Sequence, residues 1–138
     1  KKDAGASVGS SIRGGEIFIG GNAGARAGIS MKGGTLIING DSGFLTGFMM
    51  QKGKIIVCGD VGQAVGDSMY EGTIYAAGKI GSLGNDATMV DINEDELLEI
   101  WNILDRYGLE QKPKFKKIVS SRKLYHLDSL ERLEKSSI

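Results

Sequence analysis

The chain has one cysteine and one histidine, Cys58 and His126, among its 138 residues. A thiol beside an imidazole can form a nucleophilic pair. These two are far apart in the sequence, however, and His126 stands between Tyr125 and Leu127 with no catalytic partner near it. One Cys and one His also fall short of the four ligands of a structural zinc site. We therefore expect both side chains to have packing or surface roles.

Acidic and amide side chains recur with a constant 19-residue step, as Asp3, Asn22, Asp41 and Asp60. Such a series could form an acidic ladder, but Asn22 interrupts it. Hydrogen bonds from these side chains to nearby backbone amides explain the series better, because Asp and Asn serve that purpose at turns. A basic series at another position also fails to persist, since it runs Arg13, Lys32, Gln51, Tyr70. We predict no catalytic, cofactor-binding or metal-binding residue in this chain.

The same step governs the first part of the chain, which contains 21 of its 22 glycines. Four units follow one another without an insertion, at residues 3–21, 22–40, 41–59 and 60–78. The pattern Gly-x-x-Gly-x-x-x-Gly recurs across them. We predict structural roles at corners for six of its glycines, because a positive φ or a close backbone contact there excludes a Cβ atom: Gly24, Gly28, Gly43, Gly47, Gly62 and Gly66.

Each unit also contains a strand-forming run, such as Thr35-Leu36-Ile37-Ile38. A repeat of this length predicts a solenoid, in which each unit is one coil and equivalent residues stack. The strands of successive coils would run parallel, about 4.8 Å apart. Two ladders should drive folding by burial: Ile17, Leu36, Ile55 and Ile74, and Ile12, Met31, Met50 and Met69.

Several known glycine-rich motifs fit this pattern less well. A dinucleotide site needs Gly-x-Gly-x-x-Gly between a strand and a long helix. A membrane Gly-x-x-x-Gly contact needs a long apolar helix, calcium-binding β-rolls have nine-residue units, and acyltransferase-type helices have a six-residue subperiod. The formal net charge of zero argues against nucleic acid and anionic membranes as partners. A single cysteine and the lack of a signal peptide favour the cytoplasm.

The composition changes near residues 85–91. Asn93 and Glu96 form a capping-box pair, apolar residues then recur at helical spacing, and Gly108 supplies a stop. The residues from Phe115 to Val119 predict an extended run, and Asp128 to Lys135 predicts a last helix with Leu130 and Leu133 inward. We expect a repeat domain at residues 1–90 and a C-terminal helix and tail, residues 91–138, that pack on the solenoid.

The repeats from Gly21 to Gly66 resemble the repeat domain at the C-terminus of the glutamate synthase large subunit. A similar domain occurs in one β-helix subunit of formylmethanofuran dehydrogenase. Residues 81–87, 115–119 and 123–125 also resemble the end of stand-alone glutamate-synthase-like subunits. The resemblance implies an all-β fold, a right-handed single-stranded parallel β-helix of about four to five 19-residue coils, with a C-terminal α-helical cap. The spacing is one residue short before Gly84, which leaves a fifth full coil open.

The resemblance further implies a non-catalytic structural subunit or domain of a glutamate-synthase-like amidotransferase/oxidoreductase assembly, which organises catalytic modules in glutamate biosynthesis. Its partners would be glutamate-synthase-like catalytic subunits, and FMN and iron–sulfur clusters are expected only in them. Two alternatives are the equivalent β-helix component of formylmethanofuran dehydrogenase and a self-standing binding module. Because the first unit begins mid-pattern at Asp3, we also expect an unpaired edge there, which indicates missing residues, a partner or self-association.

Overall fold

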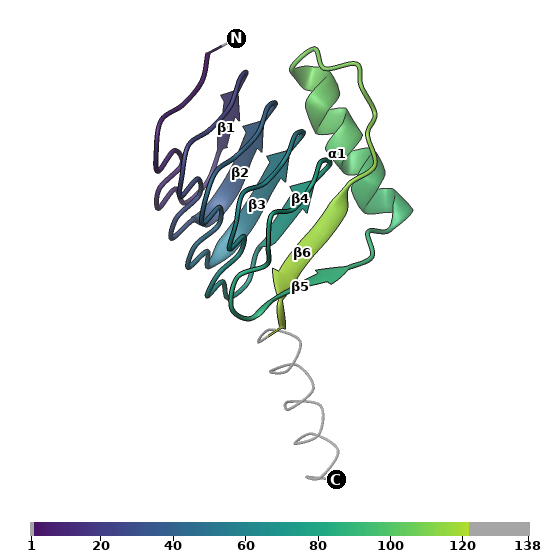
Figure 1. Ribbon diagram of the computed structural model, residues 1–138. Helices are drawn as coiled ribbons and strands as arrows, with labels where there is room; N and C mark the ends of the chain where they lie inside the picture. The colour runs from purple at the N-terminus through teal and green to yellow at the C-terminus, as the bar shows by residue number, and fades with distance from the viewer. Residues whose placement is uncertain (1, 122–138) are drawn as a thin grey trace, which may run out of the picture.

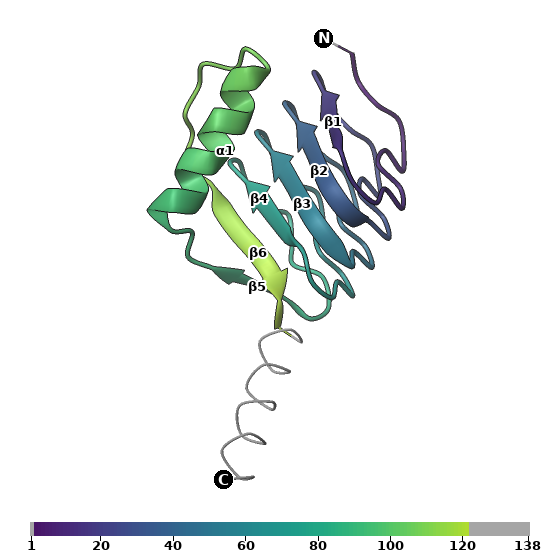
Figure 2. The same cartoon turned by 180° about the vertical axis from the view of Figure 1, so that it is seen from behind.

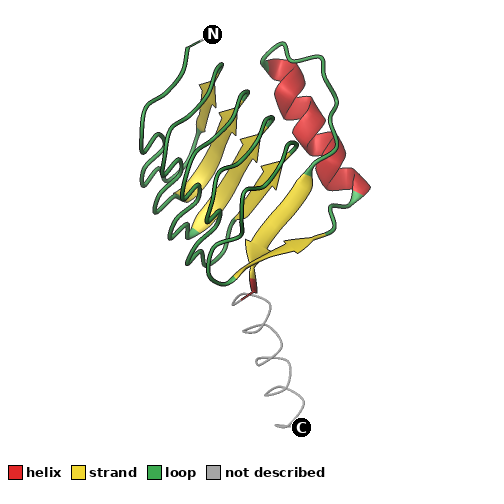
Figure 3. Cartoon of the chain, viewed as in Figure 1, coloured by secondary structure: helices red, strands yellow, loops and turns green. Residues whose placement is uncertain are grey.

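The computed structural model describes residues 2–121, which form a mostly β structure with one short α-helix (Figure 3). The β-solenoid makes about three turns. No helix within residues 2–121 is long and apolar enough to cross a membrane. The elements in chain order are β1 (Glu16–Ile19), β2 (Lys32–Ile38), β3 (Lys52–Val57), β4 (Thr73–Ala76), β5 (Ala87–Val90), α1 (Glu94–Arg106) and β6 (Lys116–Ser120).

Strands β1 to β4 are stacked in parallel, one strand from each repeat unit (Figure 1). Their register is the 19-residue interval of the sequence, so that Leu36 is aligned with Ile17 on one side and with Ile55 on the other. One irregularity interrupts it, because Lys32 pairs with Lys52 instead of Gln51. The repeat and the predicted ladder of Ile17, Leu36, Ile55 and Ile74 are therefore confirmed as the basis of the fold.

The solenoid has an apolar interior built from residues that face inward from every coil. Leu36, Ile55 and Ile74 are completely buried. Met31, Met50 and Met69 are equally buried and belong to the same cluster. Burial of each of these side chains stabilises the fold by about 1.5–3 kcal/mol. The interior thus follows directly from the repeat.

The C-terminal end of the solenoid is paired differently from the coils within it. Val61 pairs with Ile80 and Val65 with Leu83 as isolated parallel bridges, and the chain then leaves the repeat. Strand β6 pairs antiparallel with both β4 and β5, which gives the sheet order β1-β2-β3-β4-β6-β5. The extended run predicted from Phe115 to Val119 is confirmed as β6, which covers the edge that β4 would otherwise expose.

Helix α1 begins where the sequence predicts. The Asn93 side chain accepts a hydrogen bond from the Glu96 amide, and the Glu96 carboxylate accepts one from the Asn93 amide. The helix lies against the outer face of the parallel strands, where Ile100 and Leu104 pack in one cluster with Ile56 (Figure 2). His126 and the predicted helix from Asp128 to Lys135 lie outside the described residues.

Candidate functional site

The Asp/Asn series of the sequence forms a row on one corner of the solenoid, and its side chains bond to backbone amides. One side-chain oxygen of Asp3 accepts a hydrogen bond of 2.7 Å from the backbone amide of Asn22, one coil further on. The same bond links Asn22 to Asp41 at 2.8 Å and Asp41 to Asp60 at 2.7 Å. Asp60 continues the row to the amide of Lys79. Each side chain thus bonds to the next coil, whereas a turn cap would bond within its own coil.

A glycine stands beside each member of this row. A Cβ atom on Gly40 would overlap the side-chain oxygen of Asn22, and one on Gly59 would overlap that of Asp41. Gly21 and Gly78 have the same relation to Asp3 and Asp60. The glycine that closes each unit therefore makes room for the oxygen that joins two coils.

The six predicted corner glycines divide into two groups. Gly28, Gly47 and Gly66 have φ of 71°, 75° and 69°. Side chains disfavour this conformation. Gly24, Gly43 and Gly62 lie outside that region but close to backbone atoms. A Cβ on Gly43 would come within 3.1 Å of the Gly24 carbonyl carbon and the Ala25 nitrogen. Close approach, rather than a positive φ, thus explains glycine at position 43.

Glu16 on β1 holds the C-terminal end of α1. Its carboxylate accepts a hydrogen bond of 2.7 Å from the Tyr107 hydroxyl and one of 2.6 Å from Arg106. The Tyr107 bond is the largest influence on the carboxyl, and with Arg106 it lowers the pKa of Glu16. The Tyr107 ring also stacks on Phe18, with centroids 4.4 Å apart.

Glu96 holds the other end of α1. Burial alone would raise the pKa of its carboxyl, but hydrogen bonds from Lys117 and Tyr75 outweigh burial, and the pKa is lowered. The Lys117 ammonium lies 2.7 Å and the Tyr75 hydroxyl 2.8 Å from the same oxygen. Burial, together with Glu96, raises the pKa of Tyr75. Between the two ends, Lys54 on β3 forms an ion pair with Glu99.

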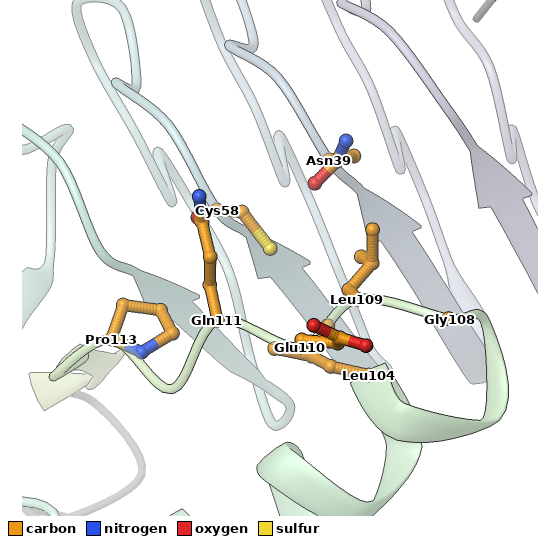
Figure 4. Close-up of a pocket in the computed structure, with 8 residues that line it drawn as sticks. All are labelled: Asn39, Cys58, Leu104, Gly108, Leu109, Glu110, Gln111 and Pro113. Atoms are coloured by element: carbon orange, nitrogen blue, oxygen red, sulfur yellow. The ribbon is translucent and has the colours of Figure 1, made fainter.

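A half-open groove of about 400 Å³ lies between the solenoid and the segment that follows α1 (Figure 4). Asn39 and Cys58 line it from successive coils, just after β2 and β3. The segment between α1 and β6 supplies the opposite side. The full lining consists of Asn39, Cys58, Leu104, Gly108, Leu109, Glu110, Gln111 and Pro113. Two amides, one carboxylate and one thiol are suited to binding a small polar group.

The groove is poorly suited to covalent chemistry. Burial raises the pKa of the Cys58 thiol to about 11, so that it stays protonated near neutral pH. The thiolate is the nucleophilic form of cysteine. Among residues 2–121, no three His, Cys, Asp or Glu side chains gather closely enough to hold a metal ion. The amide of Cys58 occupies the same place in the stack as those of Asn39 and Ala77.

Sequence reasoning missed one charged row. A strict 19-residue alignment places Gln51 beside Lys32, but the irregularity between Lys32 and Thr35 of β2 puts Lys52 there. Arg13, Lys32 and Lys52 are all exposed. The sequence did hold a signal, because Lys52 directly follows Gln51 and a one-residue bulge shifts the pairing by one place.

Comparison with known protein families gives one finding. The model of a family described as GXGXG motif matches residues 4–121, which include the four repeat units except their first residue, Asp3, as well as α1 and β6. No curated protein matches the chain.

Proposed function

The chain belongs to the GXGXG motif family, which is related to the glutamate synthase large subunit, and from this membership we propose a structural role for it. It would be a non-catalytic subunit or domain of a glutamate-synthase-like amidotransferase/oxidoreductase assembly. Its solenoid would hold the catalytic modules of that assembly in a fixed relation. FMN and iron–sulfur clusters would reside in those partners, and the assembly would work in the cytoplasm.

The row from Asp3 to Asp60 carries the proposal. Side chains that could serve chemistry bond instead to the backbone of the next coil, at 2.7–2.8 Å. Hydrogen bonds of this kind, repeated at each coil, resist shear between coils and make the solenoid a stiff spacer. Stiffness is the property that a scaffold between catalytic modules requires.

The proposal includes the finer description of the fold. The solenoid is expected to be right-handed, because crossovers between parallel strands are nearly always right-handed. The count of four to five coils includes the partial unit that ends near Gly84, and β6 and α1 would act together as the C-terminal cap. The division at residues 90 and 91 stays a prediction.

The test is reconstitution with glutaminase and flavin-containing synthase subunits from the same source. Glutamine-dependent glutamate formation should require the chain, and size-exclusion chromatography should recover one complex. Asp41→Ala is the most informative variant, because it weakens the row and leaves the apolar interior intact. Full activity and an unchanged complex without the chain would overturn the proposal. Recovery of molybdopterin subunits from the native extract would assign the chain instead to a formylmethanofuran-dehydrogenase-type assembly.

The groove favours a second interpretation, that of a self-standing binding module. Its amide and carboxylate groups, from Asn39, Gln111 and Glu110, could orient a small polar ligand. Ligand screening by calorimetry of the isolated chain separates this interpretation from the first. Saturable binding that Asn39→Ala abolishes, with no partner needed, would support a binding module.

A further inference from the structure

Four large apolar side chains occupy one turn of the solenoid, in the unit of residues 41–59. They are Phe44, Leu45, Phe48 and Met49, which we call the unit-3 patch. Phe44 is 48% exposed and Met49 50% exposed, while Leu45 and Phe48 are partly exposed. Large apolar surfaces that stay open to water usually mark a contact site.

The other units differ at these four positions. Apart from Ile29 and Arg26, the equivalents are small or polar: Ala6, Ala25 and Gln63; Ser7 and Ala64; Ser10 and Asp67; Ser11, Ser30 and Ser68. Backbone hydrogen bonds, such as that from the Met49 amide to the Asp67 carbonyl, place these equivalents in register. Since no other coil has more than one large apolar side chain at these positions, the solenoid itself does not require four of them.

The backbone conformation at Met49 is unusual for a long apolar side chain. Its φ is 55°, and the equivalent residues Ser11, Ser30 and Ser68 have φ of 58°, 53° and 58°. Three units place serine at this positive φ, and one places a long apolar side chain. Leu45, with φ of 60°, is a second bulky residue in this conformation. Positive φ costs about 1 kcal/mol for such residues, so a compensating contact is expected at the patch.

The described chain ends close to this patch. The amide and hydroxyl of Ser121 donate to the Asp86 carbonyl at 2.7 and 2.9 Å. The neighbouring Asn85 accepts from the Ser68 amide at 3.0 Å, and Ser68 stands one coil beyond Met49. With about 5 Å per coil, the patch begins on the order of 15 Å from Ser121. Figures 1 and 2 show that β6 ends on the side of the sheet where β1 to β4 begin, and the unit-3 patch directly precedes β3 in the chain.

The segment from position 122 to position 138 is long enough to reach across the patch. An extended chain of that length spans roughly 55 Å, and a helix spans roughly 25 Å. Leucine recurs in this segment at every third position, as Leu124, Leu127, Leu130 and Leu133. Such spacing places side chains on neighbouring turns of a helix face. Residues of both charge signs lie between them, which suits the flanking Arg26 and Asp67.

We propose that the unit-3 patch is a docking surface, and that its occupant is the segment 122–138 of the same chain. Four side chains offer far less than the roughly 800 Å² per partner that a stable dimer buries. A tethered segment needs less contact area, because its effective concentration at the patch is already high. The inference does not depend on the proposed function.

Methionine oxidation in the full chain tests the docking. Met49 and Met89 are each 50% exposed in the structure, so dilute peroxide should oxidise them at similar rates if nothing covers the patch. Docking predicts that Met49 reacts several-fold more slowly than Met89, and that a chain ending at Ser121 loses this protection. Peptide mass spectrometry gives both rates. Equal rates in the full chain, or protection that survives the truncation, would overturn the proposal.

A substitution within the unit-3 patch provides a second test. Phe44→Ser should release the segment and speed trypsin cleavage after Arg122 and Lys123 several-fold. Leu98→Ser on α1 is the matched control, because Leu98 is 54% exposed and lies on another face. Unchanged melting temperatures would show that both variants fold. Equal cleavage rates in the two variants, or Met49 protection that appears only at high protein concentration, would overturn docking within one chain.

Discussion

The two faces of the parallel strands are held by different kinds of contact. Inward, Ile55 lies between Leu36 and Ile74, and every coil repeats the arrangement. Outward, Ile56 meets α1, which is fixed by single contacts such as Arg106 to Glu16, 90 residues apart. The inner face is thus built from neighbours in the repeat, and the outer face from distant parts of the chain.

Substitutions on the two faces should therefore have different effects. A change at the inner ladder should affect the stack on both sides, because each coil contacts only its neighbours. A change at the outer face should loosen α1 first and leave the stack standing. The two faces of one strand therefore offer matched tests of the same fold.

The largest loss of stability is expected at Gly47, a corner constrained both by its positive φ and by its contact with the inner face. Gly47→Val introduces a β-branched residue at φ of 75°, and its Cβ would lie 2.5 Å from the Cδ1 atom of Ile74. Backbone strain and overpacking together should lower the free energy of unfolding by about 3–5 kcal/mol. Urea denaturation measures the loss. Gly14→Val is the control, since nothing lies within 4 Å of its Cβ position, and an equal loss there would contradict the corner explanation.

The second test compares the two faces within one strand. Ile55→Ala and Ile56→Ala each remove a completely buried side chain, and each should cost about 2–5 kcal/mol. Hydrogen exchange should distinguish them. Ile55→Ala should speed exchange in β2, β3 and β4 together, whereas Ile56→Ala should speed it mainly in α1. The same exchange pattern in both variants would show that the faces are not separable.

The repeat explains how far sequence reasoning could go. Because Leu36, Ile55 and Ile74 share one interval, their common ladder could be predicted without any structure. The Asn93 cap was equally accessible, since it depends on residues three apart. The contact of Glu16 with Tyr107 could not be predicted, because no period relates two positions 91 residues apart. The groove between Asn39 and Glu110 was missed for the same reason.

A smaller effect is expected in the row of side chains between coils. Asp41→Ala removes the acceptor for the Asp60 amide, which then bonds to water, so the loss should be about 1 kcal/mol. Asp41→Asn should be nearly neutral, because Asn22 makes the same bond with an amide oxygen. Thermal melts of the two variants measure the difference. If Asp41→Asn were as damaging as Asp41→Ala, the carboxylate charge rather than the hydrogen bond would matter.

The smallest effect concerns Glu96, on the outer face, and it should depend on pH. Its lowered pKa means that the folded state prefers the charged form, so its contribution is present above the ordinary value of 4.5 and disappears as the pH falls through the folded value. Glu96→Gln should therefore cost about 0.5 kcal/mol at pH 7, a modest figure because the ion pair is partly open to water. Once the pH falls below the folded pKa, the variant and the parent chain should converge, and chemical denaturation at several pH values measures this. A constant difference across that range would mean that the amide disturbs the packing around Tyr75 instead of removing a charge. The measurement thus distinguishes an outer face held by charge from one held by shape.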